Sequence, residues 1–196
     1  MSGQPDDDFI EEMRALESSY LEHEDPIRRS GFGGGPIRWE SERRPLTHGI
    51  DRSGSFLDVG CANGWLALCV RDWCRERGLE IESFGVDIGS ELVAEAADRL
   101  SDTWAADAWR WVPPRRFTFV YSLLDLSPTD LIGNWLSRLA SWVEPGGRLI
   151  IGSYGSVSRG VAPADVALAM RTAGLIVVGE TSAADHTVTG FAWAGP

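Results

Sequence analysis

The sequence has 196 residues, which suits a single domain large enough to bury a hydrophobic core. Its 29 acidic residues outnumber its 18 basic residues, so the net charge is −11. Proteins that bind nucleic acid or an anionic membrane surface need an excess of Lys and Arg, so we expect neither partner.

The chain begins with a segment that differs from the rest, up to about residue 53. Apolar residues recur at helical spacing over residues 9–21 and predict an amphipathic helix, with acidic residues at its start that complement the helix dipole. The glycine-rich stretch 30–36 cannot continue a helix. We expect it to form a flexible loop, followed by a basic stretch with Arg38, Trp39, Arg43 and Arg44. Residues 1–53 are therefore expected to form a lid segment, and residues 54–196 the core.

From residue 55 onward, short apolar runs alternate with stretches of helical periodicity. Strands are predicted at 56–59, 81–86, 103–105, 117–122, 148–152, 175–179 and 187–193. Helices are predicted at 64–77, 91–100, 128–143 and 162–173. This alternation predicts an α/β fold with a mostly parallel sheet and right-handed crossovers.

The first strand runs into a loop that contains Asp58, Gly60 and Gly64. Parallel sheets bind ligands beyond the carboxyl ends of their strands, and glycines there let the backbone approach a ligand. The loop lacks the G-x-G-x-x-G pattern that cradles a pyrophosphate, which argues against a nicotinamide-linked oxidoreductase. The alternative is a tight strand-to-helix turn without a ligand.

Two further aspartates follow the next strands. Asp87 ends the second strand, where a carboxylate can accept hydrogen bonds from the two hydroxyls of a ribose. The alternative for Asp87 is a helix cap or a surface acid. Asp107 follows the third strand, where it can accept a hydrogen bond from an adenine amino group.

In this order the segments resemble the motifs of class I S-adenosylmethionine (SAM) dependent methyltransferases. FLDVGCANGWLA resembles the first motif, D/E-x-G-x-G-x-G, with Ala62 in place of the middle glycine. FGVDIG and AADA resemble the ribose and adenine motifs. FTFVYSLLDLSP and VEPGGRLII resemble the fourth and fifth strands, with Thr118 where an acid is common. The resemblance covers roughly residues 54–194.

The resemblance implies a Rossmann-like, doubly wound sheet of seven mostly parallel strands, with the order 3-2-1-4-5-7-6 and the seventh strand antiparallel. It implies in-line methyl transfer from SAM to O, N or S of a small molecule, with no metal. The implied cofactor-binding residues are Asp58, Gly60, Cys61, Ala62, Gly64, Asp87, Ile88, Asp107, Ala108, Tyr121 and Ser122. Among them Gly60 and its neighbours would contact the methionine part, Asp87 the ribose, and Ile88 and Asp107 the adenine.

Several residues are weaker candidates. Tyr121, His48 or His186 is a candidate catalytic group, the histidines as general bases, although solvated loop histidines are commoner. Tyr154, Arg38 and Trp39 are candidate acceptor-binding residues, the last two within a lid formed by residues 9–44. The alternative is a helix packed permanently on the sheet, with a solvated basic loop.

Some alternatives stay open on the sequence alone. The chain fits a SAM-binding protein of other chemistry, or a non-catalytic SAM-binding module, and the sequence predicts no oligomeric state. Its start, MSGQPDDDF, does not resemble a secretory signal, and no run of about 18 apolar residues would span a membrane. Its three cysteines fit neither a disulfide framework nor a zinc site. We therefore expect a cytoplasmic protein.

Overall fold

The computed structural model describes residues 3–155, 160–183 and 189–195. Seven strands form one sheet in the order β3-β2-β1-β4-β5-β7-β6, as predicted, and β7 runs antiparallel to both of its neighbours. The strands are β1 (Gly54–Val59), β2 (Ile81–Asp87), β3 (Asp102–Ala105), β4 (Phe117–Leu123), β5 (Val143–Tyr154), β6 (Ile176–Ser182) and β7 (Thr189–Gly195). The parallel pairs β1–β2, β1–β4 and β4–β5 bring the carboxyl ends of the central strands to one edge.

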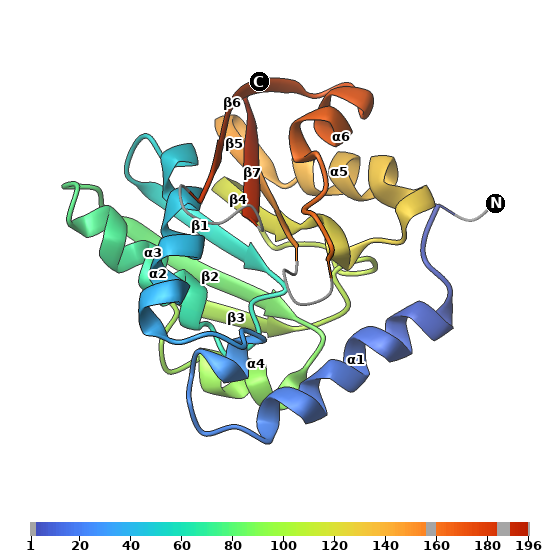
Figure 1. The fold of residues 1–196 in the computed structure, drawn as a ribbon. Helices are drawn as coiled ribbons and strands as arrows, with labels where there is room; N and C mark the ends of the chain where they lie inside the picture. The colour runs from blue at the N-terminus through green and yellow to red at the C-terminus, as the bar shows by residue number, and fades with distance from the viewer. Residues whose placement is uncertain (1–2, 156–159, 184–188, 196) are drawn as a thin grey trace.

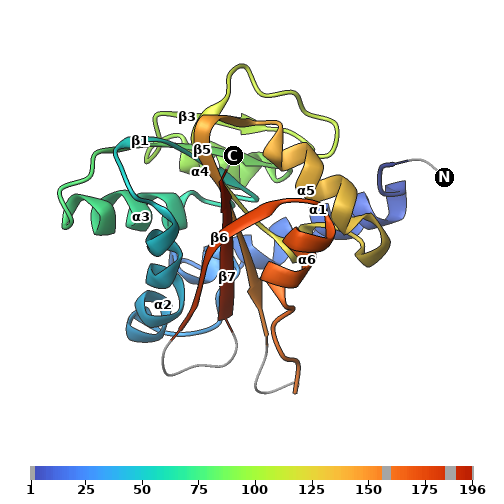
Figure 2. The same ribbon diagram turned by 90° about the horizontal axis from the view of Figure 1, so that it is seen from above.

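Helices cover both faces of this sheet (Figures 1 and 2). They are α1 (Asp7–Leu21), α2 (Pro36–Arg43), α3 (Trp65–Arg75), α4 (Ser90–Ala96), α5 (Ile132–Ala140) and α6 (Val166–Thr172). Figure 2 shows α2 and α3 on one side of the strands and α5 and α6 on the other. Among the helices of the described residues, none combines the length and the hydrophobicity needed to cross a membrane.

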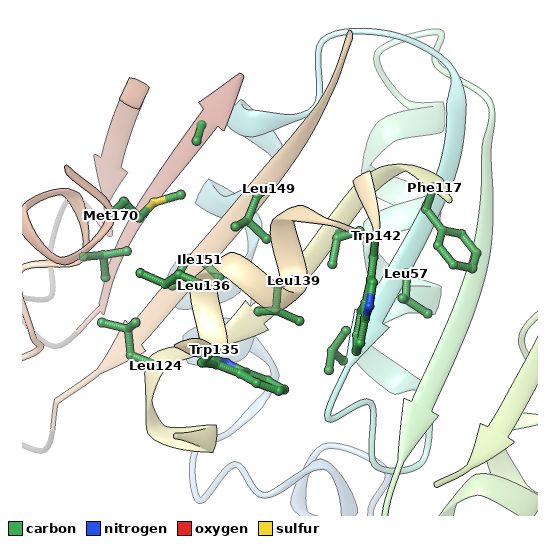
Figure 3. Close-up of a cluster of buried hydrophobic side chains, with 14 of the residues drawn as sticks. Leu57, Phe117, Leu124, Trp135, Leu136, Leu139, Trp142, Leu149, Ile151 and Met170 are labelled. Carbon is green, nitrogen blue, oxygen red and sulfur yellow. The ribbon is translucent and has the colours of Figure 1, made fainter. Parts of the chain in front are cut away.

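The sheet separates two buried clusters, because successive side chains of a strand point to opposite faces. On one face, Leu57 of β1 and Ile151 of β5 pack with Trp135, Leu136 and Leu139 of α5 (Figure 3). On the other face, Phe56, Phe119 and Tyr121 pack with residues of α2 and α3. Asp58 lies two residues after Phe56, so its side chain points to the second face.

The basic stretch of the N-terminal segment, to which the sequence assigned no helix, forms a second helix. Pro36 begins α2, as its fixed φ suits a first helical turn. An ion pair one turn apart, with Arg38 Nε 2.6 Å from Glu42 Oε1, adds to the stability of the helix. The apolar face of α2 is Trp39, which is only 4% exposed. The glycines of the preceding loop hid this short helix from the sequence pattern.

Several boundaries also differ from the prediction. The helix expected at 128–143 is a short 3-10 turn, Thr129–Leu131, followed by α5. The helix expected at 162–173 begins only at Val166, where the Asp165 carboxylate caps it by accepting the N–H of Leu168. In contrast, β5 begins five residues earlier than expected, because Val143 pairs with Phe117 across an irregular register. The Glu-Pro-Gly-Gly residues therefore lie within β5, at its irregular register with β4, and Gly146 has a φ of 78°.

Candidate functional site

The loop between β1 and α3 turns sharply beneath the carboxyl edge of the sheet. Gly60 and Gly64 have φ values of 84° and 74°, which favour glycine, and Ala62 has a φ of 44°. Ala62 is the single residue other than glycine with a positive φ in the described part of the chain. At Gly60 a Cβ atom would lie 2.5 Å from Leu126 Cδ1, so a larger residue would displace Leu126 and would also strain the backbone at this positive φ. The loop therefore carries local strain of the kind that gathers at functional sites.

Asp87, at the end of β2, holds this loop in place. Its Oδ2 atom accepts the N–H of Ala62 at 2.8 Å, and its Oδ1 atom accepts the N–H of Gly89 at 2.8 Å. Burial raises the pKa of Asp87, and these two backbone hydrogen bonds oppose that rise. Each carboxylate oxygen has a second lone pair, so Asp87 can still accept hydrogen bonds from a ligand.

Asp58 is the least compensated acid of the site. It is 2% exposed, and within the described ranges its Oδ2 atom has no hydrogen-bond partner. Burial, and then the negative charge of Asp87, raises the pKa of Asp58 to about 8. A buried carboxyl group without a partner is costly, and a perturbed pKa in such a place is typical of a binding site.

Asp107 follows β3, and one of its two carboxylate oxygens has a hydrogen-bond partner. Its Oδ1 atom accepts the N–H of Trp109 at 2.9 Å. Its Oδ2 atom has no hydrogen-bond partner among residues that the structure describes, and the nearest cationic nitrogen is Arg110 NH1 at 3.5 Å. Asp107 therefore keeps a free acceptor, as adenine recognition would require.

A cavity of about 160 Å³ lies beyond these strand ends. Its floor combines the residues that the sequence motifs predicted, namely Gly60, Ala62, Asp87, Ile88, Asp107 and Ala108. Its roof is one face of α1, with Phe9, Ile10, Met13, Leu16, Glu17 and Tyr20. Figure 1 shows α1 running along the open side of the molecule, past the ends of β2 and β3. The predicted amphipathic helix thus encloses the predicted binding loop.

The remaining predicted cofactor residues lie around this cavity and do not line it. Ser122 is buried and donates a hydrogen bond to the carbonyl of Val59. Cys61 packs beneath Gly85, and burial raises the pKa of its thiol well above the ordinary value, so it remains protonated. Gly64 lies against Ala96 and shapes the start of α3.

Tyr121 and Tyr154 form a pair next to Asp58. Their hydroxyl oxygens are 2.6 Å apart, and Tyr121 is the register partner of Asp58 across β1 and β4. Burial raises the pKa of both phenols, so both are protonated near neutral pH. They can donate hydrogen bonds, and neither is suited to accept a proton from a substrate.

The other candidate residues lie elsewhere. Arg38 is half-exposed and paired with Glu42, and Trp39 is buried against Phe32 between α2 and the sheet. His48 Nδ1 is 3.3 Å from Thr181 Oγ1 of β6, at the far edge of the sheet. His186 lies outside the described residues.

Sequence reasoning gave no role to two charged residues at the site. Glu17, on α1, accepts the N–H groups of Glu91 and Leu92 at 2.8 and 3.2 Å and so caps the first turn of α4. Arg43, at the end of α2, is 7% exposed and lies against the ring of Tyr154. The helical spacing in the sequence was enough to place Glu17 on α1. The position of Arg43 could not be predicted, because α2 was not predicted.

Comparison with known proteins adds a family to this geometry. A family model described as a methyltransferase domain matches residues 38–173. No curated protein matches the chain significantly.

Solved structures share the fold at low sequence identity. The N-methyltransferase NodS from Bradyrhizobium japonicum WM9, bound to S-adenosyl-L-homocysteine, has a TM-score of 0.70 at 17% identity, covering 94% of this chain and 98% of NodS. Magnesium protoporphyrin IX methyltransferase from Synechocystis PCC 6803 has a TM-score of 0.67 at 14% identity, covering 96% and 99%. A TehB-like SAM-dependent methyltransferase from Corynebacterium glutamicum ATCC 13032 Kitasato has a TM-score of 0.64 at 16% identity, covering 92% and 98%.

Proposed function

We propose that this chain, which belongs to the methyltransferase domain family, transfers a methyl group from SAM to an O, N or S atom of a small molecule. One observation supports the proposal above the others: Asp87, Asp107 and the glycine loop, predicted separately from three motifs, border a single cavity. The cytoplasm suits the three cysteines, all of which are free thiols.

The residues around the cavity fit the parts of SAM. Asp87 has lone pairs left for the ribose hydroxyls, and Asp107 Oδ2 is free for the adenine amino group. Ile88 and the stacked rings of Trp109 and Trp135, 4.8 Å apart, offer apolar surface beside the base. Asp58, buried and uncompensated, suits the ammonium group of the methionine moiety. A cationic ligand is the one that such a set of carboxylates would stabilise.

When bound, SAM supplies an electrophilic methyl group on a sulfonium. The chain's own contribution is to align the acceptor and to exclude water, which supply much of the acceleration in a direct displacement. We assign the hydrogen-bonded pair of Tyr121 and Tyr154 to orienting the acceptor. Both phenols remain protonated near neutral pH, and their mutual hydrogen bond leaves one hydroxyl proton to donate. We also propose that α1, which roofs the cavity, acts as the lid that closes over it.

The acceptor is proposed to be a small molecule. The net charge of −11 opposes a polyanionic substrate, and the carboxylates at the site add to this repulsion.

The test is methyl incorporation from isotopically labelled SAM, screened over a fractionated pool of metabolites, with products resolved by mass spectrometry. We expect label in a small-molecule fraction with the wild type, and a reduced yield with Asp87→Asn. Asp98→Asn, an exposed aspartate just beyond α4, is the matched control and should behave as the wild type. Folded protein that binds SAM yet labels no fraction would favour a non-catalytic SAM-binding role.

A further inference from the structure

Arg43 is a buried guanidinium enclosed by aromatic rings. Its Cζ atom lies 3.6 Å from the ring centroid of Tyr154, 4.5 Å from that of Phe32 and 5.3 Å from that of Trp39. Its side chain is 8% exposed, so water contributes little to its solvation. The electron-rich faces of the rings attract the cation and help to hold it at this depth.

Among the described residues, the charge of Arg43 is only partly balanced by a carboxylate. Its nearest carboxylate is Glu42, with Oε2 3.6 Å from Arg43 NH1, while Oε1 of the same carboxylate is bonded to Arg38 Nε. Two guanidinium groups therefore share one carboxylate. Arg43 NH1 is buried and has no hydrogen-bond partner within the described segments. Burying a cation while one of its N–H groups lacks an acceptor destabilises the fold, unless a ligand supplies that acceptor.

A short chain of contacts joins Arg43 to the proposed donor site. The Arg43 guanidinium contacts the ring of Tyr154, whose hydroxyl meets that of Tyr121, and Tyr121 is the register neighbour of Asp58. Asp58 is likewise buried, its Oδ2 atom has no hydrogen-bond partner among the described residues, and when ionised it carries the opposite charge. The tyrosine pair thus lies between a partly compensated cation and a buried acid with a free oxygen.

An α-amino acid matches this arrangement because it carries an ammonium and a carboxylate on one carbon. Resting on the proposed function, we propose that Arg43 binds the carboxylate of the methionine moiety of SAM, opposite Asp58 at the ammonium. The planar fork of an arginine suits bidentate contact with a carboxylate. Arg43 lies at the end of α2, so the N-terminal segment contributes to the donor site as well as covering it.

The test compares two ligands by calorimetry: S-adenosylhomocysteine, and its decarboxylated analogue, which keeps the ammonium and lacks the carboxylate. We expect wild-type protein to bind S-adenosylhomocysteine at least about 10-fold more tightly than the analogue. Arg43→Gln should weaken S-adenosylhomocysteine by about 10- to 150-fold, the range expected for losing a hydrogen bond to a charged group. Its affinity for the analogue should change by less than about 3-fold.

The ratio of the two affinities is the readout, because a general loss of structure would weaken both ligands alike. Arg44→Gln is the matched control: Arg44 is the next residue, is partly exposed and pairs with Glu40 and Glu76, so the ratio should not change. Arg43→Lys, which keeps the charge, should keep part of the discrimination and replaces Arg43→Gln if that variant does not fold.

Three results would overturn the inference. Equal weakening of both ligands by Arg43→Gln would make Arg43 a packing residue. Unchanged affinity of Arg43→Gln for both ligands would show that Arg43 does not bind the carboxylate of the cofactor. Equal binding of both ligands by wild-type protein would overturn the inference and leave the proposed function intact, whereas binding of neither would overturn the proposed function itself.

Discussion

The three aspartates of the site differ in how fully the protein satisfies them. Asp87 accepts two backbone hydrogen bonds, Asp107 accepts one and keeps a free oxygen, and Asp58 has a buried oxygen with no partner in the described part of the structure. Groups that the fold satisfies serve structure as well as binding. A buried group that lacks a hydrogen-bond partner in the free protein is stabilised when a ligand supplies that partner.

Substitution of Asp87 should therefore affect both binding and folding. We expect Asp87→Asn to weaken SAM binding by about 10- to 150-fold, through lost charge-assisted hydrogen bonds to the ribose. Asp87→Ala should in addition destabilise the fold by about 1–3 kcal/mol, because the N–H groups of Ala62 and Gly89 lose their acceptor. Calorimetric titration and chemical denaturation measure the two effects. Asp87→Ala with unchanged affinity would place the ribose elsewhere.

Asp58 should make ligand binding release a proton. Its pKa of about 8 leaves it largely protonated at pH 7 in the free protein, and a cationic ligand favours the ionised form. The observed binding enthalpy of S-adenosylhomocysteine at pH 7 should then vary with the ionisation enthalpy of the buffer, and this dependence should be absent in Asp58→Asn. A buffer-independent enthalpy in the wild type would show that Asp58 is not at the ammonium.

The same shift predicts a pH dependence of stability. Because the pKa of Asp58 is higher in the folded state than its ordinary value of 3.8, the folded state retains the proton longer. The contribution to stability is fully present below about pH 4 and is lost as the pH rises to about 8. Denaturation of the ligand-free protein should show a fall in unfolding free energy over this window that is smaller in Asp58→Asn. Identical slopes would contradict the assignment.

At the scale of elements, α1 and α4 are joined across the cavity. The carboxylate of Glu17, on α1, accepts hydrogen bonds from two N–H groups in the first turn of α4, and so connects the two helices. A surface ion pair, Asp7 to Arg110 at 2.8 Å, adds little because both side chains are at least half exposed. Because α1 supplies the residues that roof the cavity, we propose that the lid expected over residues 9–44 consists of α1.

Hydrogen exchange tests the lid. We expect the amides of α1 to gain protection when S-adenosylhomocysteine binds, by more than those of β1 and β4. Glu17→Ala should speed exchange in α1 and in the first turn of α4 in the free protein, since the cap is lost. Glu12→Ala, on the exposed side of the same helix, is the control. Equal protection of α1 with and without ligand would make it a static part of the fold.

The sequence predicted what depends on local pattern and did not predict what depends on distant contacts. The glycine loop and the motif aspartates follow from local pattern, and the strand order follows from the resemblance to the family. The cap of α4 by Glu17 joins residues 74 positions apart, and the cage of Arg43 joins α2 to Tyr154 at the end of β5. No local spacing shows such contacts. Trp39, expected in an acceptor pocket, is buried against Phe32, and its ring lies beside the Arg43 guanidinium.

For the whole molecule, the sheet order decides where the ligand lies. The first strand, β1, lies inside the sheet, and the next two strands extend the sheet outward to β3. The chain then returns to β4 on the other side of β1, which leaves a crevice at the carboxyl ends of β1 and β4. The glycine loop, Asp58 and Tyr121 all lie at this crevice. In the proposed arrangement, the ends of β1 to β3 bind the adenosine half of the cofactor, and β4 and β5 border the acceptor.

The molecule's charge predicts how turnover responds to salt. With a net charge of −11 and a small acceptor, kcat/KM should change by no more than about 2- to 3-fold between 50 and 200 mM salt. An enzyme that binds nucleic acid through several phosphates would lose about 10³- to 10⁵-fold in affinity over that range. Methylation of bulk RNA or DNA at rates comparable with a metabolite would contradict the small-molecule assignment.

The central claim is that SAM binds in the cavity between the glycine loop and α1. It is tested most directly by titrating isotope-labelled protein with S-adenosylhomocysteine and following each backbone amide by nuclear magnetic resonance. We expect saturable shifts at a single site, concentrated in residues 60–64, 87–89 and 106–108 and in α1. Folded protein whose amides do not shift, or shift only at other parts of the surface, would contradict it.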